Sequence, residues 1–188
     1  GARDKDGNVI DTTFTIPVVS TVARNYDRTF GIEIIDKVMY LNGKRLVIVG
    51  VNRHEWNPKT GRCIGLEEMK WDMDCIQKNN INAVRTCHYP DQIPWYYMCD
   101  EAGVYVMAET NLESHGSWQK LGAVEPSCNV PGSLPRWREV VVDRARSNYE
   151  TFKNHTSILF WSLGNESYAG DDIEAMNGDY IGVRACVK

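Results

Sequence analysis

Residues 160–167 read FWSLGNES, and this stretch decides the fold class of the chain. Its first part is an apolar run, which predicts a buried β-strand. The strand ends in an amide and a carboxyl group that stand side by side, Asn165 and Glu166. Polar side chains of this kind at the carboxyl end of a buried strand are typical of barrel enzymes.

Three earlier stretches show the same arrangement. Residues 52–55 read NRHE, residues 85–89 read RTCHY and residues 109–115 read ETNLESH, and each follows a predicted strand. The carboxyl ends of the strands of a barrel meet on one face, where active sites are built. Four polar strand ends therefore indicate a functional site rather than polar residues that are merely exposed to solvent.

From residue 37 onward the sequence predicts strands and helices in alternation. The predicted strands cover residues 46–51, 83–86, 104–108 and 158–163, and the predicted helices cover residues 66–78, 94–101, 136–153 and 171–176. Right-handed crossovers between such strands imply a parallel sheet covered by helices. A doubly wound sheet is disfavoured because no GxGxxG phosphate turn occurs. We therefore expect part of an α/β (β/α)8 TIM barrel, with a long loop over residues 112–135.

The sequence divides into two parts. In residues 1–36 a turn is predicted at residues 6–8, and residues 12–22, which are rich in Thr, Val, Ile and Phe, predict one or two β-strands. We expect them to finish a β-sandwich domain that lies upstream, because so few strand residues cannot fold alone. Residues 37–188 would form the N-terminal half of the barrel, truncated after the fourth strand, since a whole barrel takes about 250 residues. Open sheet edges then predict either a missing C-terminal barrel half or self-association.

Composition and charge exclude several classes of function. With 188 residues, of which 43% are hydrophobic and 24% charged, the chain is an ordinary globular protein that can bury a core. The formal net charge of -4 offers no basic surface for nucleic acid. The sequence also contains no run of about eighteen apolar residues, the length needed to span a bilayer. Six cysteines without a CxxC pair indicate free thiols, so we expect a reducing, cytoplasmic compartment.

Four stretches, in this order, resemble the catalytic barrel of the family 2 glycoside hydrolases. They are GVNRHEWNP at residues 50–58, NAVRTCHYP at 82–90, WYYMCDEAGVYVMAETNLESHG at 95–116 and KNHTSILFWSLGNES at 153–167. The nearest branch is the large β-galactosidases. β-Glucuronidases and β-mannosidases share the Asn-Glu pair, but LESHG and SLGNES look like the galactosidase versions. The resemblance therefore implies a retaining β-galactosidase acting on β-galactosides, with a β-glucuronidase-type relative as the alternative.

The same resemblance implies roles for individual residues. Glu166 would be the general acid/base, which protonates the leaving glycosidic oxygen and then deprotonates water. Asn165 would bind the sugar 2-hydroxyl, and His54 and His88 would contact the sugar. A retaining enzyme needs a second carboxylate roughly 5 Å from the first as nucleophile. In the family this glutamate lies on a later strand, so we expect the nucleophile outside this chain.

A magnesium ion is also implied by the resemblance. Glu113, His115 and Glu166 resemble the magnesium ligands of the family, and two carboxylates, one imidazole and waters suit this ion tolerably. The ion would set the charge environment of the acid/base. Proton donation also requires a neutral carboxyl group on Glu166 at first, and apolar neighbours such as Phe160 and Trp161 would favour that form.

Other residues have structural explanations. We expect Arg85 to pair with a carboxylate inside the barrel, because buried charges need partners. Glu109 ends an apolar strand and could be the nucleophile, but the resemblance to the family implies a structural acid there. His155 precedes its strand, so we expect it to be structural. Trp56 and Trp118 offer flat faces on which a sugar can stack.

The sequence leaves two other functions open. A catalytically incomplete barrel fragment would bind a carbohydrate or a metal without hydrolysing anything. A metal hydrolase of phosphate or amide bonds would lose its activity on chelation and would not be inhibited by galactose.

Overall fold

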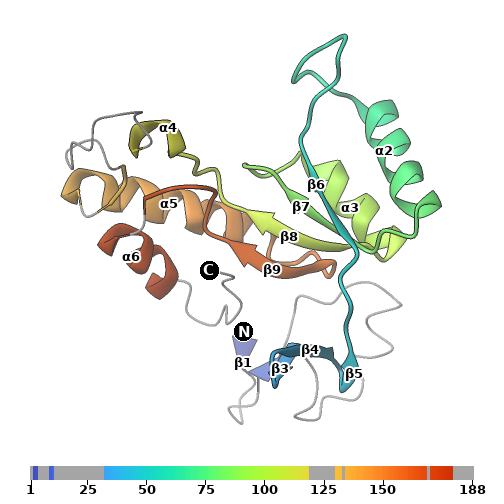
Figure 1. Cartoon of the computed structure of the whole chain (residues 1–188), viewed down its shortest axis with the longest axis horizontal. Coiled ribbons are helices and arrows are strands. Elements are labelled where there is room, and N and C mark those ends of the chain that lie inside the picture. The colour runs from blue at the N-terminus through green and yellow to red at the C-terminus, as the bar shows by residue number, and fades with distance from the viewer. Residues whose placement is uncertain are drawn as a thin grey trace.

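The structure, a computed structural model, describes residues 2–3, 9–10, 32–118, 130–132, 134–168 and 170–179. At its centre lies a parallel sheet of four strands in the order β6-β7-β8-β9 (Figure 1). The strands are β6 (Gly50–Arg53), β7 (Ala83–Thr86), β8 (Tyr105–Glu109) and β9 (Ile158–Ser162). The predicted α/β class with a parallel sheet is therefore confirmed.

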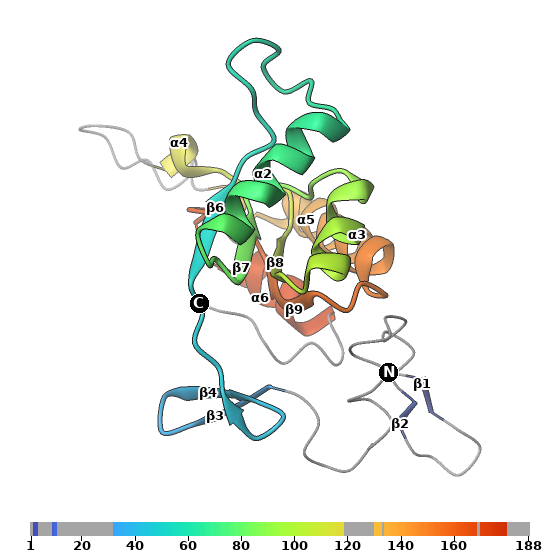
Figure 2. The same cartoon turned by 90° about the vertical axis from the view of Figure 1, so that its right-hand side faces the viewer.

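Helices connect the successive strands of this sheet. α2 (Leu66–Lys78) joins β6 to β7, α3 (Ile93–Ala102) joins β7 to β8, and α5 (Pro135–Phe152) lies between β8 and β9. Buried side chains of all three helices pack in one apolar cluster with Val84 and Trp161 of the sheet. The helices therefore cover the same face, as right-handed crossovers between strands in unbroken order require. In Figure 2, α3 and α5 lie to the right of β6 and β7.

The side chains of each strand alternate between this helical face and the opposite one. In β8, Val106 and Ala108 are fully buried under the helices, whereas Tyr105 and Met107 are only partly buried. Because Arg85 of β7 is paired with Met107 in register, its side chain belongs to the opposite face. The residues that build the site rise from this face, which the described helices leave uncovered.

The first predicted strand, over residues 46–51, is displaced in the structure. β6 begins at Gly50, and the four residues before it form no regular element. Three valines that we expected to be buried are 55%, 50% and 38% exposed, namely Val47, Val49 and Val51. The prediction of a buried strand is wrong for this segment, because β6 lies at the edge of the described sheet with β7 as its neighbour.

The other elements of this part match their predictions closely. α2 and β7 have the predicted bounds, while α3, β8 and α5 differ by one residue at each end and β9 by one residue at its C-terminal end. Met69, Met73 and Ile76 of α2 are buried at helical spacing, as predicted. α3 ends at Gly103, whose φ of 68° is the left-handed conformation that closes a helix.

The chain between β8 and α5 contains more helix than we predicted. A short helix, α4 (His115–Trp118), follows β8, and residues 119–129 lie outside the described part. α6 (Asp171–Asp179) begins as predicted but continues past the Asn-Gly pair that we expected to end it, since propensity is a weak determinant of helix length. No helix among the described residues is long and apolar enough to cross a membrane.

The first part of the chain is described in separate pieces. β1 (Ala2–Arg3) pairs antiparallel with β2 (Val9–Ile10). The turn predicted at residues 6–8 and the one or two strands predicted over residues 12–22 lie outside the described residues. The assignment of this part to an upstream sandwich stays a prediction.

Three short strands form an antiparallel sheet ahead of the barrel part: β3 (Ile32–Ile35), β4 (Val38–Leu41) and β5 (Lys44–Arg45). The Asn-Gly pair at residues 42–43 predicts a hairpin, and the structure has one between β4 and β5, with Asn42 and Gly43 at φ of 52° and 73°. The hairpin between β3 and β4, which also has a two-residue turn, was not predicted. Its turn residues, Asp36 and Lys37, also have positive φ, but they include no glycine that would signal a turn.

Candidate active site

The polar residues predicted at the strand ends meet at one rim of the sheet. Glu113 and Asn165 form a parallel bridge beyond β8 and β9, and the backbone N–H of Asn165 donates to the Leu112 carbonyl over 2.8 Å. Beyond β6 and β7, the N–H of Cys87 donates to the Arg53 carbonyl over 2.9 Å. These hydrogen bonds join the loops of neighbouring strands in pairs, and they bring the predicted site residues together.

A buried carboxylate organises the centre of the rim. Glu109, at the end of β8, is fully buried, and its Oε2 accepts hydrogen bonds from Arg85 Nε over 2.6 Å and from Ser162 Oγ over 2.7 Å. Its Oε1 lies 2.7 Å from Nδ1 of His88. The expected carboxylate partner of Arg85 is therefore Glu109. Because both of its oxygens are hydrogen-bonded, Glu109 fits the structural role that we expected. No signal in the sequence indicated that Ser162 would be one of its partners.

Arg85 also orients the amide of Asn165. The Nη2 of Arg85 donates to Oδ1 of Asn165 over 2.9 Å, and Nδ2 of the same amide donates to Oε2 of Glu113. The guanidinium can only donate, so it determines which side of the amide carries the oxygen. An amide nitrogen has two donors, which allows a second hydrogen bond to a ligand.

Two histidines that we expected to contact a sugar lie together at the rim. The ring centroids of His54 and His88 are 5.2 Å apart, and the rings are nearly perpendicular. Glu109 holds Nδ1 of His88, so Nε2 is the nitrogen that a ligand can use. The hydroxyl of Tyr89 lies 3.4 Å from Nδ1 of His54. Burial, then the positive charges of His88 and two nearby arginines, lower the pKa of His54 and favour its neutral form.

The three residues predicted to hold a metal ion are also brought together. The backbone N–H of His115 donates to Oε1 of Glu113 over 2.8 Å, and the His115 Nδ1 contacts Oε2 of Glu166. Burial acts to raise the pKa of the Glu113 carboxyl, but hydrogen bonds from Asn165 and from the His115 N–H lower it below its ordinary value. Glu113 is therefore ionised at neutral pH, as the ligand of a cation must be.

Glu166 is more open than we expected. Its side chain is 51% exposed, and its φ of 40° turns the chain sharply beyond β9. Trp161 packs in the core against Tyr149, with ring centroids 5.1 Å apart. The structure therefore does not give Glu166 the apolar surrounding that we expected from Phe160 and Trp161. It places an accessible carboxylate beside an imidazole.

A second charged cluster lies next to the rim. Arg53, buried at the end of β6, has Nη1 2.7 Å from Oδ2 of Asp91 and 3.3 Å from Oε1 of Glu55. Its Nε donates to Asp72 over 3.0 Å, and its guanidinium lies 3.8 Å from the ring centroid of Trp95. One positive charge thus faces three carboxylates, and burial raises the pKa of Asp91 to about 7.

The cluster around Arg53 ties the loops after β6 and β7 to α2 and α3. Arg53 and Glu55 stand in the NRHE stretch, but no local pattern connects them with Asp72 or Asp91, which lie 19 and 38 residues beyond Arg53. Sequence reasoning therefore missed this cluster.

Three further residues were singled out in the sequence. His155 precedes β9, and its Nδ1 is 2.7 Å from Oδ2 of Asp100, which fits the structural role that we expected. Trp56 is 59% exposed, so a ligand can reach its ring. The side chain of Trp118 is outside the described part of the chain.

The turn that positions Asn165 requires a glycine. Gly164 has a φ of 153°, and a Cβ atom placed on it would lie 2.5 Å from the carbonyl oxygen of Leu112. The same oxygen accepts the N–H of Asn165. The close approach of the two loops therefore depends on the absence of a side chain at position 164.

Relatives of known sequence match this chain over most of its length. A family model for the TIM barrel domain of family 2 glycosyl hydrolases matches residues 32–181. The β-galactosidase large subunit of Lactobacillus acidophilus is 74% identical over 145 residues, which are 77% of this chain and 23% of that protein. A β-galactosidase of Clostridium acetobutylicum is 53% identical over 92% of this chain and 18% of its own length. The chain thus spans about a quarter or less of these relatives.

Solved structures of similar fold include enzymes with other names. A β-glucuronidase from Ruminococcus gnavus matches 79% of this chain and 24% of its own, with a TM-score of 0.65 and 25% identity. A β-galacturonidase from Eisenbergiella tayi, bound to galacturonate, matches 70% of this chain and 22% of its own, with a TM-score of 0.59 and 27% identity. Both agree with the domain type of the family model.

Gly164→Ala is expected to destabilise the rim, because the added methyl group would meet the Leu112 carbonyl. We expect a loss of about 1–3 kcal/mol in the free energy of unfolding, measured with urea. Gly116→Ala is the matched control, since nothing lies within 4 Å of a Cβ at that position. Equal stability of the two variants would contradict the close approach.

Asp91→Asn is expected to flatten the pH dependence of stability. The folded-state pKa of Asp91 is raised from 3.8 to about 7, so the folded protein holds a proton that the unfolded chain has released. This contribution is full below about pH 4 and is lost as the pH rises to 7, by at most about 1.4 kcal/mol per pH unit. Urea unfolding across this range should show the loss in the parent protein and not in the variant. Parallel pH profiles would refute the assignment.

Proposed function

This chain belongs to family 2 of the glycoside hydrolases, and from that premise we propose that the whole protein is a retaining β-galactosidase. It would remove terminal, non-reducing β-D-galactose from β-galactosides, and this chain would supply the acid/base side of its active site. The position of Glu166 carries the proposal. It is an accessible carboxylate at the carboxyl end of a barrel strand, next to Asn165 and in contact with His115.

Glu166 acts first as a general acid and then as a general base in this proposal. It protonates the glycosidic oxygen as the bond to the aglycone breaks, and later it takes a proton from the attacking water. Its half-exposed side chain supports this role, because both the substrate oxygen and water can reach it. The imidazole of His115 is placed to stabilise the carboxylate after the proton has left.

The sugar is held by Asn165, His54 and His88. Asn165 donates its amide N–H to the 2-hydroxyl, and the hydrogen bond from Arg85 to its oxygen supports that orientation. A neutral His54 can donate or accept a hydrogen bond to a sugar hydroxyl, and the Nε2 of His88 faces away from its carboxylate partner. Trp56 adds an exposed ring for stacking.

A galactoside is favoured over a glucuronide as substrate. The relatives named β-galactosidase reach 74% identity, whereas the similar β-glucuronidase structure shares 25%.

The nucleophile is proposed to lie outside residues 1–188. A retaining mechanism needs a second carboxylate roughly 5 Å from the acid/base. Glu109 is fully buried with both oxygens bonded, and both oxygens of Glu113 accept hydrogen bonds, so neither is suited to attack. Turnover by the 188-residue chain alone would contradict this assignment and favour a complete site within it.

A magnesium ion is proposed at Glu113, His115 and Glu166. Two carboxylates from neighbouring loops, with Glu113 kept ionised, make a donor set that fits a hard cation. When bound, the ion would supply positive charge beside the acid/base. Glu113 and Asn165 would keep their hydrogen bond, so the metal ligands and the sugar-binding amide are positioned together.

The chain is proposed to be the N-terminal half of the barrel, preceded by strands that finish an upstream β-sandwich. The exposed valines before and within β6 support this, because further strands would cover them. The name "large subunit" carried by close relatives supports a partner chain in the complete enzyme. Alone, the chain is expected to self-associate through its open edges. The four described cysteines are free thiols, which supports a cytoplasmic location.

Glu166→Gln is expected to lower the hydrolysis of lactose by about 100- to 10,000-fold in the complete enzyme, because proton transfer is lost. For a nitrophenyl galactoside, the first step should slow less in Glu166→Gln, because this leaving group needs little protonation. With Glu166→Ala, azide should restore turnover and give β-galactosyl azide, since azide needs no general base. Glu174→Gln, on the exposed surface of α6, is the control. A folded Glu166→Gln variant with full activity on lactose would refute the assignment of Glu166 as the general acid/base.

Glu113→Gln is expected to weaken the response to magnesium. Chelation should lower the activity of the parent enzyme, and magnesium should restore it. In the variant, the magnesium concentration for half-maximal activity should rise at least about 10-fold, because one carboxylate ligand is lost. The same magnesium titration with Glu174→Gln serves as control, and an unchanged requirement in Glu113→Gln would argue against this site.

A further inference from the structure

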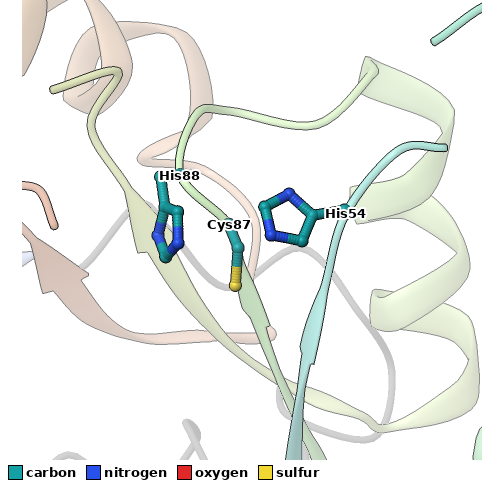
Figure 3. Close-up of side chains that lie close together, drawn as sticks. All are labelled: His54, Cys87 and His88. Atoms are coloured by element: carbon teal, nitrogen blue, oxygen red, sulfur yellow. The ribbon is translucent and has the colours of Figure 1, made fainter. Parts of the chain in front are cut away.

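Three metal-binding side chains lie together on the β6 and β7 side of the rim (Figure 3). His54, Cys87 and His88 each offer one nitrogen or sulfur atom, and these atoms all lie within 4.8 Å of one another. In Figure 3 the side chain of Cys87 lies between the two imidazole rings. The hydrogen bond from the Cys87 N–H to the Arg53 carbonyl joins the two loops that carry the group.

We propose that His54, Cys87 and His88 bind a zinc ion, and that the bound ion blocks the sugar site. The metal site itself depends only on the geometry of these three residues. The blocking effect rests on the proposed function, because it assumes that His54 and His88 contact the galactoside.

The ligand set selects zinc over magnesium. Two imidazoles and one thiolate are preferred ligands of zinc, whereas magnesium requires mainly oxygen. Bonds of about 2.0–2.3 Å hold tetrahedral zinc ligands roughly 3.3–3.6 Å apart. Since the three ligand atoms already lie within 4.8 Å, side-chain movements of little more than about 1 Å close the site. The fourth position would stay open to water.

The surroundings of His88 support a metal ligand. Its Nδ1 is held by the buried carboxylate of Glu109 at 2.7 Å, which leaves Nε2 for the metal in the carboxylate–histidine–metal arrangement common in zinc sites. Arg85 opposes a cation, because its Nη2 lies 3.4 Å from the same His88 Nδ1. The ion pair of Arg85 with Glu109, at 2.6 Å, offsets this charge.

Cys87 would supply the sulfur ligand. The residue is fully buried, and its Sγ donates to the Arg85 carbonyl over 3.3 Å, a weak hydrogen bond that zinc binding would replace. As the sulfur–zinc bond forms, the S–H bond breaks and its proton passes to the solvent, with no change of oxidation state.

The test uses the complete enzyme with magnesium in large excess over zinc, which competes with zinc for the proposed magnesium site, and Glu113→Gln is titrated in parallel to identify zinc bound there. Calorimetric titration with zinc chloride should show one zinc ion bound per chain. In Cys87→Ser the dissociation constant for zinc should rise by more than the roughly 10- to 100-fold that is typical of losing an outer hydrogen-bond partner. Cys63→Ser, which removes an exposed thiol elsewhere, should bind zinc as the parent does. Zinc should inhibit nitrophenyl galactoside hydrolysis competitively in the parent and in Cys63→Ser, and much less in Cys87→Ser.

Each outcome is informative. Zinc binding that survives Cys87→Ser unchanged would overturn the metal site. Binding that depends on Cys87 without competition against the galactoside would uphold the site and overturn the blocking effect. If the parent binds zinc but hydrolyses no galactoside, the proposed function fails while the metal site stands. Should Cys87→Ser not fold, cobalt titration of the parent decides, since the absence of a thiolate-to-cobalt charge-transfer band would refute ligation by Cys87.

Discussion

The carboxylate of Glu109 is the constraint on which the rim depends. A buried charge is tolerated only when it is paired and hydrogen-bonded, and this one is fully enclosed. Its side-chain partners come from the two strands beside β8 or the loops after them: Arg85 and His88 from the β7 side and Ser162 from β9. One group thus sets the orientation of a histidine on one side of the site and, through Arg85, of Asn165 on the other.

Local patterns were sufficient to predict most elements of the sheet and its helices. The spacing of Met69, Met73 and Ile76 allows only one face of α2 to be buried, and the structure buries that face. Gly103 marked the end of α3 because a left-handed residue is needed there. The polar strand ends predicted one rim, since parallel strands all point their carboxyl ends the same way.

What could not be predicted depends on contacts between distant residues. The sequence indicated that Arg85 needs a carboxylate but could not choose Glu109, which lies 24 residues away. The cluster of Arg53 with Asp91 has no local signal at all. The exposure of Val51 reflects which strands lie beside β6, and the apolar pattern of the segment carries no information on that.

The carbonyl oxygen of Leu112 receives the N–H of Asn165 and leaves no room for a side chain at Gly164. The peptide carbonyl of Leu112 therefore holds the loop after β8 and the loop after β9 in a fixed register. Insertions or deletions between β8 and Leu112 would shift Glu113 relative to Asn165 and spoil both together. These inner segments therefore tolerate few changes. Substitutions that alter ligand contacts are expected instead at exposed side chains of the periphery, such as Trp56.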